Sequence, residues 1–382
     1  MTAVPSASPE YDVAILGGGL AGLSLAVRLA EPRFRHRRVL VVERRASYVR
    51  DRTWCYWRLG PHPFEAAVTH RWARWAVARP GARVERSAPG TPYECIPADR
   101  FYALALARIE AAPNVELRRE AVAAPSEDAD GVALGLPGGE RARVAFDSRP
   151  PPDLGRRGLA QCFLGQEIET ERPIFDPGCA TLMDLEPAPG GVHFTYVLPT
   201  SRTRALVEDT WFVRPGFVQP GLARPDGPPR DHGAALEAWL RAHGAGEHRV
   251  LFEERGRLPM DPRFRPARGR RLIPLGGAAG AHRPATGYAF SRVQAECDRV
   301  ADALLAGRLP RARPRPAAVR GMDRALLTLL ARRPQLAPRL FPGLFAHCPA
   351  PRLVRFLADR PRTGDLAAVV LATARALAGA AA

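Results

Sequence analysis

The sequence predicts an α/β protein in which a parallel sheet, built around a glycine-rich turn, is interrupted by a largely antiparallel unit. An apolar strand, a glycine-rich turn and an apolar helix follow one another over residues 12–29, and a second apolar strand covers residues 39–43. A later apolar segment enters another glycine-rich turn at residues 272–280, which indicates that the chain returns to the first sheet. The length of 382 residues allows two or three packed units.

The first turn matches the GxGxxG pattern at Gly17, Gly19 and Gly22. In this pattern the first glycine permits a tight turn, the second lets the backbone approach a pyrophosphate, and the third allows helix and strand to pack closely. The N-terminus of the next helix faces the phosphates. The second strand ends in Glu43, about 20 residues beyond the last glycine, where a carboxylate can accept ribose hydroxyls. These features predict a dinucleotide site, and both FAD enzymes and some NAD dehydrogenases fit them.

Later segments favour FAD. A helix over residues 99–111 and a strand over 114–117 lie where such folds cover the adenine, and residues 144–149 are typical of the strand and turn that close the first cofactor segment. The turn at 272–280 contains Gly276 and Gly280, and a helix over 287–305 is expected to follow it. Many flavoproteins have Gly-Asp in this turn, with the Asp holding the ribityl chain, whereas this chain has Gly276-Gly277.

The charge balance is strongly basic. Net charge is +17, and all 56 basic residues are Arg, which excludes chemistry that needs a P-loop Lys or a Lys Schiff base. This charge favours either an anionic membrane face or a composition bias toward Arg, Ala, Pro and Gly. Nucleic acid is not expected, because the arginines are scattered and no aromatic platform accompanies them.

The cysteines and the hydropathy pattern indicate a cytoplasmic protein. The six cysteines show no CxxC spacing and no pairing with His, so no metal site is expected. The segment before Tyr11 lacks the features of a cleavable signal, and glycines interrupt the apolar run over residues 13–27. We therefore expect, at most, peripheral attachment to the inner face of the cell membrane.

Five segments, in order, are similar to motifs of the FAD-dependent lycopene cyclase family, including bacterial lycopene beta-cyclases. They are Asp51–Trp57 (with Arg-Thr-Trp-Cys-Tyr-Trp), residues 163–184, Leu206–Thr210, Phe252–Met260, and Gly276–Phe290 (with Pro-Ala-Thr-Gly-Tyr). Together they extend over roughly residues 11–300. The resemblance implies an enzyme that closes the ends of linear lycopene into β-ionone rings. It also implies reduced FAD as cofactor and NAD(P)H as the reductant.

The same resemblance suggests site residues. Protonation of an alkene requires a carboxylic acid that stays protonated, and burial raises the pKa of a carboxyl group. Glu208 follows an apolar strand and matches the family's acid, with Asp209 and Glu254 as supporting acids that share or accept a proton. The cofactor would contact Arg52, Thr286 and Gly287 in addition to the glycines and Glu43. Taken singly, such acids are more often solvated ends of strands, and Thr286 could be a simple helix cap.

The expected organisation has four parts. Residues 1–10 form a tail, residues 11–155 and 265–308 a discontinuous FAD-binding domain, and 156–264 a substrate domain with 61–94 beside it. Residues 309–382 form a helical C-terminal region. A helix over 323–333 and the apolar segments after it carry leucines beside arginines, which suits either a membrane interface or packing on the protein itself.

Two other functions fit parts of the pattern. An FAD-dependent monooxygenase or dehydrogenase acting on a hydrophobic substrate would share the fold and transfer electrons. A non-catalytic binder of anionic surfaces would explain the net charge and would bind no flavin.

Overall fold

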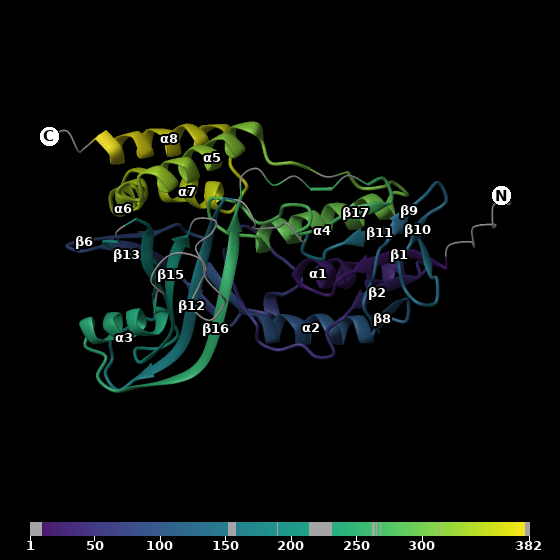
Figure 1. The fold of residues 1–382 in the computed structure, drawn as a ribbon, viewed down its shortest axis with the longest axis horizontal. Helices are drawn as coiled ribbons and strands as arrows, with labels where there is room; N and C mark the ends of the chain where they lie inside the picture. The colour runs from purple at the N-terminus through teal and green to yellow at the C-terminus, as the bar shows by residue number, and fades with distance from the viewer. Residues whose placement is uncertain are drawn as a thin grey trace.

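The structure is a computed structural model that describes residues 10–151, 158–188, 190–213, 231–261, 264, 266–267, 269–311 and 313–378. Two large sheets lie at opposite ends of the molecule, and helices at the C-terminus cover the second of them (Figure 1). Almost all of the expected N-terminal tail lies outside the described residues.

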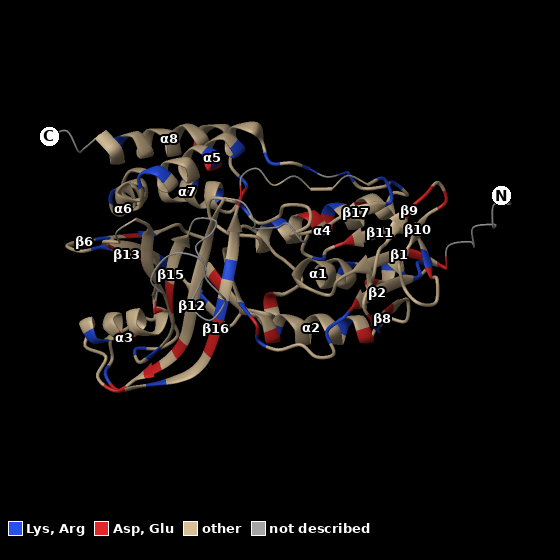
Figure 2. Cartoon of the chain, in the orientation of Figure 1, with Lys and Arg blue, Asp and Glu red and all other residues tan. Residues whose placement is uncertain are grey.

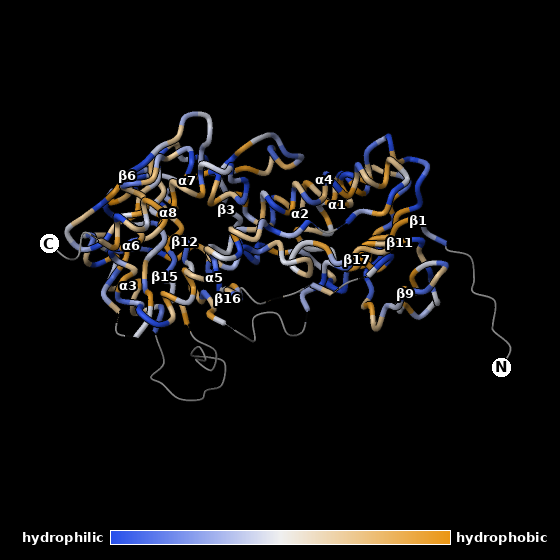
Figure 3. The backbone as a smooth tube through the Cα atoms, turned by 90° about the horizontal axis from the view of Figure 1, so that it is seen from above, coloured by the Kyte–Doolittle hydropathy of each residue, from blue (hydrophilic) through white to orange (hydrophobic). Residues whose placement is uncertain are grey.

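The first sheet is predominantly parallel and is built around the glycine-rich turn. Its order is β8–β2–β1–β11–β10–β9, with β17 paired to β11. Its strands are β1 (Tyr11–Leu16), β2 (Val39–Glu43), β8 (Val115–Arg119), β9 (Ser126–Glu127), β10 (Val132–Ala133), β11 (Arg141–Asp147) and β17 (Leu272–Pro274). Every residue of β2 is buried, as expected for a strand inside a parallel sheet covered on both faces. In the hydropathy view the tube is most strongly apolar near β1 and β11 (Figure 3).

Three helices pack with this sheet: α1 (Leu20–Leu29), α2 (Ala98–Glu110) and α4 (Phe290–Leu305). Their apolar faces share one core, which includes Leu23, Phe101 and Val293. Arg28 of α1 is buried and donates to Gln294 and Asp298 of α4. These contacts fix the late helix α4 against the helix that begins at the glycine turn.

The second sheet is mostly antiparallel, with the order β16–β12–β15–β14–β13–β5–β6. Its strands are β5 (Arg74–Arg79), β6 (Ala82–Ser87), β12 (Leu159–Thr170), β13 (Cys179–Glu186), β14 (Val192–Pro199), β15 (Arg204–Val213) and β16 (His248–Met260). Only β13 and β5 pair in parallel among its described strands. Helix α3 (His232–Ala242) packs on one face through Leu236 and Trp239.

The C-terminal helices cover the other face of this sheet. They are α5 (Ala317–Arg332), α6 (Ala337–His347), α7 (Ala350–Leu357) and α8 (Thr363–Ala378). Short 3₁₀ helices cover Pro32–Phe34, Glu65–Ala67 and Pro334–Leu336. A small sheet of β3 (Thr53–Trp57), β7 (Tyr93–Pro97) and β4 (His70–Trp72) contributes residues to the cores of both halves. No helix among the described residues is both long enough and apolar enough to cross a bilayer.

The α/β fold class and the discontinuous arrangement of the first sheet are confirmed. Two helix boundaries were placed wrongly. Helix α4 begins at Phe290 rather than at residue 287, because Gly287 has φ +74° and interrupts the helical path. Helix α5 begins at Ala317, six residues earlier than expected, directly after Pro316, which is favourable just before a helix.

Candidate active site

A cavity of about 790 Å³ lies between the second sheet, the small sheet and the C-terminal helices. Its walls include Arg52, His282 and Thr286 on the side of the first sheet, and Val370 and Thr373 of α8 among the C-terminal helices. Its size is in the range of small-molecule pockets, and most of its lining is apolar or aromatic. The few acidic groups on its wall therefore stand out as reactive candidates.

Glu208 and Glu254 meet in this cavity across a glycine. Gly165 of β12 pairs with Glu208 of β15 on one side and with Glu254 of the edge strand β16 on the other. A Cβ atom at position 165 would lie 2.9 Å from Cγ of Glu208 and 3.2 Å from Cγ of Glu254. The missing side chain thus leaves the space in which both carboxyl groups lie.

This environment holds a proton on the pair. Burial, the charge of Glu254 and a hydrogen bond with it raise the pKa of Glu208 well above its ordinary value. Burial also raises the pKa of Glu254, against the opposing effects of a hydrogen bond from Thr53 and the charges of Arg50 and Arg52. The Thr53 hydroxyl donates to Oε2 of Glu254 at 3.1 Å. Glu208 is therefore the member of the pair with the stronger hold on its proton.

Asp209 lies on the opposite face of the sheet. Successive residues of a strand point to opposite faces, so Asp209 faces α3 while Glu208 faces the cavity. Its carboxylate contacts the rings of His193 and His232 and accepts a hydrogen bond from Trp211. Burial would raise the pKa of Asp209, but the hydrogen bonds from the two histidines lower it. We expected Asp209 to share or accept a proton beside Glu208. Its position on the opposite face of the sheet corrects this expectation.

An aromatic wall lies beside the acid pair. We use this name for Trp57, Tyr93, Tyr196 and Tyr288, all of which line the cavity. The ring of Trp57 is 4.8 Å from that of Tyr93 and 5.3 Å from that of Tyr288. The hydroxyl of Tyr93 is 2.9 Å from that of Tyr196 and 3.0 Å from that of Tyr288. Burial raises the pKa of each tyrosine, so the phenols are neutral.

Tyr196 pairs directly with Glu208 across β14 and β15. The aromatic wall therefore begins next to the acid, and its aromatic side chains line the cavity. Such faces stabilise a positive charge nearby without supplying a strong base that would remove a proton early.

The first glycine turn fits a dinucleotide. Gly17 has φ +98°, and a Cβ atom at Gly22 would lie 1.9 Å from the carbonyl oxygen of Gly17. A Cβ atom at Gly19 would meet nothing within 4 Å, so this side of the turn is open to a pyrophosphate. No side chain caps the N-terminus of α1. Glu43 is buried and accepts the backbone N–H groups of Gly18 and Arg45, which holds its carboxylate beside the turn.

The second glycine-rich turn, at which the chain returns to the first sheet, also lies against helix α1. Gly276 has φ +60°, and a Cβ atom there would lie 2.2 Å from Cβ of Ala21 in α1. Gly280 and Gly287 also have positive φ, and both Thr286 and Gly287 line the cavity. Thr286 accepts the N–H of Tyr288 and does not cap α4, whose preceding residue is Ala289. The structure thus places the second group of predicted cofactor residues between the glycine turn and the acid pair.

Arg52 is the most exposed of the predicted site residues on the cavity wall. It lies at the rim, where its guanidinium contacts Asp51 at 3.1 Å. Together with the open face at Gly19, this arrangement allows a long dinucleotide to extend from α1 toward the cavity.

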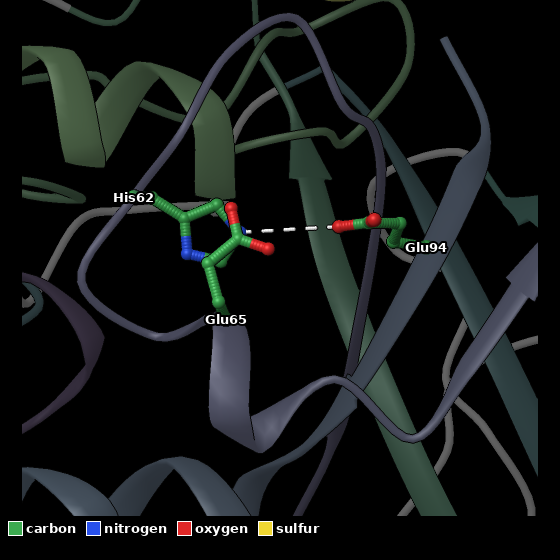
Figure 4. Close-up of side chains that lie close together, drawn as sticks. All are labelled: His62, Glu65 and Glu94. Carbon is green, nitrogen blue, oxygen red and sulfur yellow. Dashed lines mark ion pairs between the residues drawn. The ribbon is translucent and has the colours of Figure 1, made fainter. Parts of the chain in front are cut away.

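His62, Glu65 and Glu94 form a second cluster of ionisable groups (Figure 4). His62 accepts the Phe64 N–H at Nδ1, so in a neutral ring Nε2 carries the proton and has no lone pair for a metal. Tyr56 and Arg71 donate to Glu94. Burial would raise the pKa of Glu94, but the His62 ring 3.9 Å away and hydrogen bonds from Arg71 and Tyr56 lower it. We interpret this cluster as a satisfied ion network.

The fold is shared with flavin-dependent enzymes of known structure. A geranylgeranyl bacteriochlorophyll reductase-like protein from Thermoplasma acidophilum has a TM-score of 0.58 at 14% identity, covering 95% of this chain and 96% of that one. A flavin-dependent brominase has a TM-score of 0.59 at 15% identity, with 95% and 97% covered. At such identities the likeness establishes a common fold.

The sequence is more specific than the fold. The family model described as "Lycopene cyclase protein" matches residues 12–378, and the chain belongs to this family. The lycopene beta-cyclase of Pantoea ananas is 28% identical over 304 residues, which cover 76% of this chain and 74% of that protein. The lycopene beta-cyclase of a Paracoccus strain is 29% identical over 303 residues, with 76% and 73% covered.

Several residues of the site were not predicted from the sequence. Gly165 lies in a recognised motif, but its meaning depends on the two strands that flank it. Tyr93 and Tyr196 carried no local signal, although the alternation of β14 was available to place Tyr196 on one face. His282 also lines the cavity, although no sequence pattern assigns it a role.

Proposed function

We propose that the protein is an FAD-dependent lycopene beta-cyclase that closes the ends of linear lycopene by acid catalysis without net redox change. The observation that carries this proposal is the protonated carboxyl pair, Glu208 and Glu254, inside an aromatic cavity. Membership of the lycopene cyclase family and the names of the relatives support it.

In the first step Glu208 transfers its proton to C2 of the terminal C1=C2 double bond. An alkene is a very weak base, so the acid must itself be uncharged, and it must lie in a site that excludes water. Burial of Glu208 meets both conditions. The resulting cation at C1 is captured by the C5=C6 double bond, which closes a six-membered ring.

In the second step the cation loses the proton on C6 and the β-ionone ring remains. Glu208 is now a carboxylate, and Glu254 beside it is held by Thr53 and faces the charges of Arg50 and Arg52. The pair therefore gives one proton and receives one, and no electrons are exchanged. The aromatic wall lowers the energy of the cation between these steps.

The cofactor and the surroundings belong to the same proposal. The glycine turns, Glu43, Arg52, Thr286 and Gly287 would hold FAD, whose reduced form, maintained by NAD(P)H, would supply negative charge near the cation. The substrate is a hydrocarbon dissolved in a bilayer, so the protein would act at the inner face of the cell membrane. Nucleic acid has no part in this function.

The test is product analysis in bacteria that accumulate lycopene, with Glu208→Gln and Glu253→Gln compared with the unchanged protein. Glu253 is the exposed neighbour of Glu254 and contacts Gln166 and Arg255. We expect cyclic products of unchanged mass from the unchanged protein and from Glu253→Gln, and none from Glu208→Gln.

One ring rather than two would keep the mechanism and define a narrower specificity. Unaltered lycopene with flavin-loaded protein, or a product gaining oxygen or losing hydrogen, would reject the cyclase and favour a monooxygenase or dehydrogenase.

A further inference from the structure

The turn that returns the chain to the first sheet is followed by His282, a histidine with a buried ring nitrogen that lacks a partner among the described residues. His282 lies on the wall of the main cavity, at the end that holds Arg52 and Thr286. Its Nδ1 atom is buried and has no hydrogen-bond partner among the described residues. A buried polar atom without a partner is costly, which indicates that a group absent from the protein itself completes it.

The position of this nitrogen is informative. A Cβ atom built on Gly277 would lie 3.3 Å from Cε1 and 3.5 Å from Nδ1 of His282. The imidazole therefore fills the space into which a side chain at position 277 would extend. The missing side chain at Gly277 and the histidine five residues later are thus spatially complementary.

The loop that carries His282 is held firmly. Ala281 donates its N–H to the carbonyl of Gly276 at 2.8 Å. Arg315 donates to the carbonyl groups of Gly280 and Ala281 and pairs with Asp359. These bonds fix the backbone on the N-terminal side of His282.

The ring is neutral. Burial lowers the pKa of His282 to about 4, and the charges of Arg52 and Arg315 act in the same direction. A neutral imidazole offers one N–H donor and one acceptor nitrogen. It can therefore bind a hydroxyl group without adding charge to the site.

We propose that His282 is a direct ligand of FAD. Its Nδ1 atom hydrogen-bonds a hydroxyl of the ribityl chain at the turn Gly276-Gly277. This inference rests on the proposed binding of FAD. His282 then makes the contact that an acidic side chain at position 277 would make, and this exchange changes the charge beside the flavin. A neutral ring here replaces a carboxylate, so an anionic reduced flavin meets less repulsion.

The direct test is FAD affinity, measured by quenching of flavin fluorescence on titration into the apoprotein. The variants are His282→Ala, His282→Asn and His282→Gln, with His36→Ala as the control because His36 is exposed. An Asn amide can place a polar atom near the position of Nδ1, whereas a Gln amide places it near Nε2. We expect about tenfold weaker binding for Ala and Gln. Asn should remain close to the unchanged protein.

A second variant tests the electrostatic consequence. Gly277→Asp combined with His282→Ala removes the close contact at position 277 and introduces a carboxylate. We expect FAD affinity to recover, with a flavin midpoint potential more negative than that of the unchanged protein, measured by spectroelectrochemistry.

Equal FAD affinity for all His282 variants, with circular dichroism unchanged, would overturn the proposal and indicate that water satisfies Nδ1. A protein that binds no FAD even when unchanged would instead reject the cofactor assignment. Neither readout depends on lycopene, so failure of the cyclase reaction is a separate result.

Discussion

At the scale of single residues, Glu208 links catalysis to stability. Its pKa is raised well above the ordinary value of 4.5, so between these two values the native state holds a proton that the unfolded state has lost. The free energy of unfolding therefore falls as pH rises above 4.5, and each unit of pKa difference corresponds to about 1.4 kcal/mol. The burial that makes Glu208 an acid thus weakens the fold as pH rises above 4.5.

We predict that Glu208→Gln abolishes cyclisation but makes the stability of the protein less sensitive to a rise in pH above 4.5. Gln has no proton to lose, so the free energy of unfolding of the variant should fall less between pH 5 and pH 9 than that of the unchanged protein. Urea denaturation at both pH values measures the difference. Glu253→Gln is the control, since hydrogen bonds from Gln166 and Arg255 lower the pKa of Glu253. A parallel loss of stability in all three proteins would contradict a protonated Glu208.

At the scale of secondary structure, strand β12 brings the acids together through Gly165. We predict that Gly165→Ala keeps the fold but lowers cyclisation by on the order of tenfold or more, because the added methyl group pushes the carboxyl groups of Glu208 and Glu254 apart. Gly60→Ala is the matched control, since a Cβ atom there meets nothing within 4 Å. Product formation per folded, flavin-loaded protein is the measurement. Equal rates for the two variants would show that the spacing of the pair is unimportant.

Some features of the fold and of the candidate site could be predicted from the sequence, and others could not. The order β1, α1, β2 could be predicted because the glycine spacing and the acid that follows are local signals. The pairing of Gly165 with both acids depends on the register of strands that are distant in sequence, and register is a non-local property. Adjacency placed Asp209 with Glu208, whereas strand alternation places them on opposite faces. Glu254, about 46 residues from Glu208, could be joined to it only through the family resemblance and then the sheet.

At the scale of the whole molecule, the two halves are tied by a buried ion pair. Arg283, beside the returning turn, donates to Asp323 of α5 at 2.9 Å, and both side chains are buried. This pair connects the turn that carries the predicted cofactor residues to the helices that cover the cavity. Basic residues are spread over both halves rather than gathered in one stripe (Figure 2), which favours a diffuse attraction to anionic surfaces.

The exposed apolar residues of α8 at the cavity suggest where a membrane would contact the protein. Val370 of α8 lines the cavity and is 55% exposed, and the adjacent Leu371 is 52% exposed. We predict that Val370→Ser combined with Leu371→Ser reduces co-sedimentation with vesicles of anionic phospholipid, because the apolar contact is lost while the net charge of +17 is unchanged. Val250→Ser with Leu251→Ser is the matched control, since these residues are 45% and 36% exposed on β16 and do not line the cavity. Raising the salt concentration should weaken binding of every protein by screening, whereas only the α8 variant should differ from the others at fixed salt. Equal sedimentation of the two double variants would place the membrane contact elsewhere and leave the basic surface as the sole attraction.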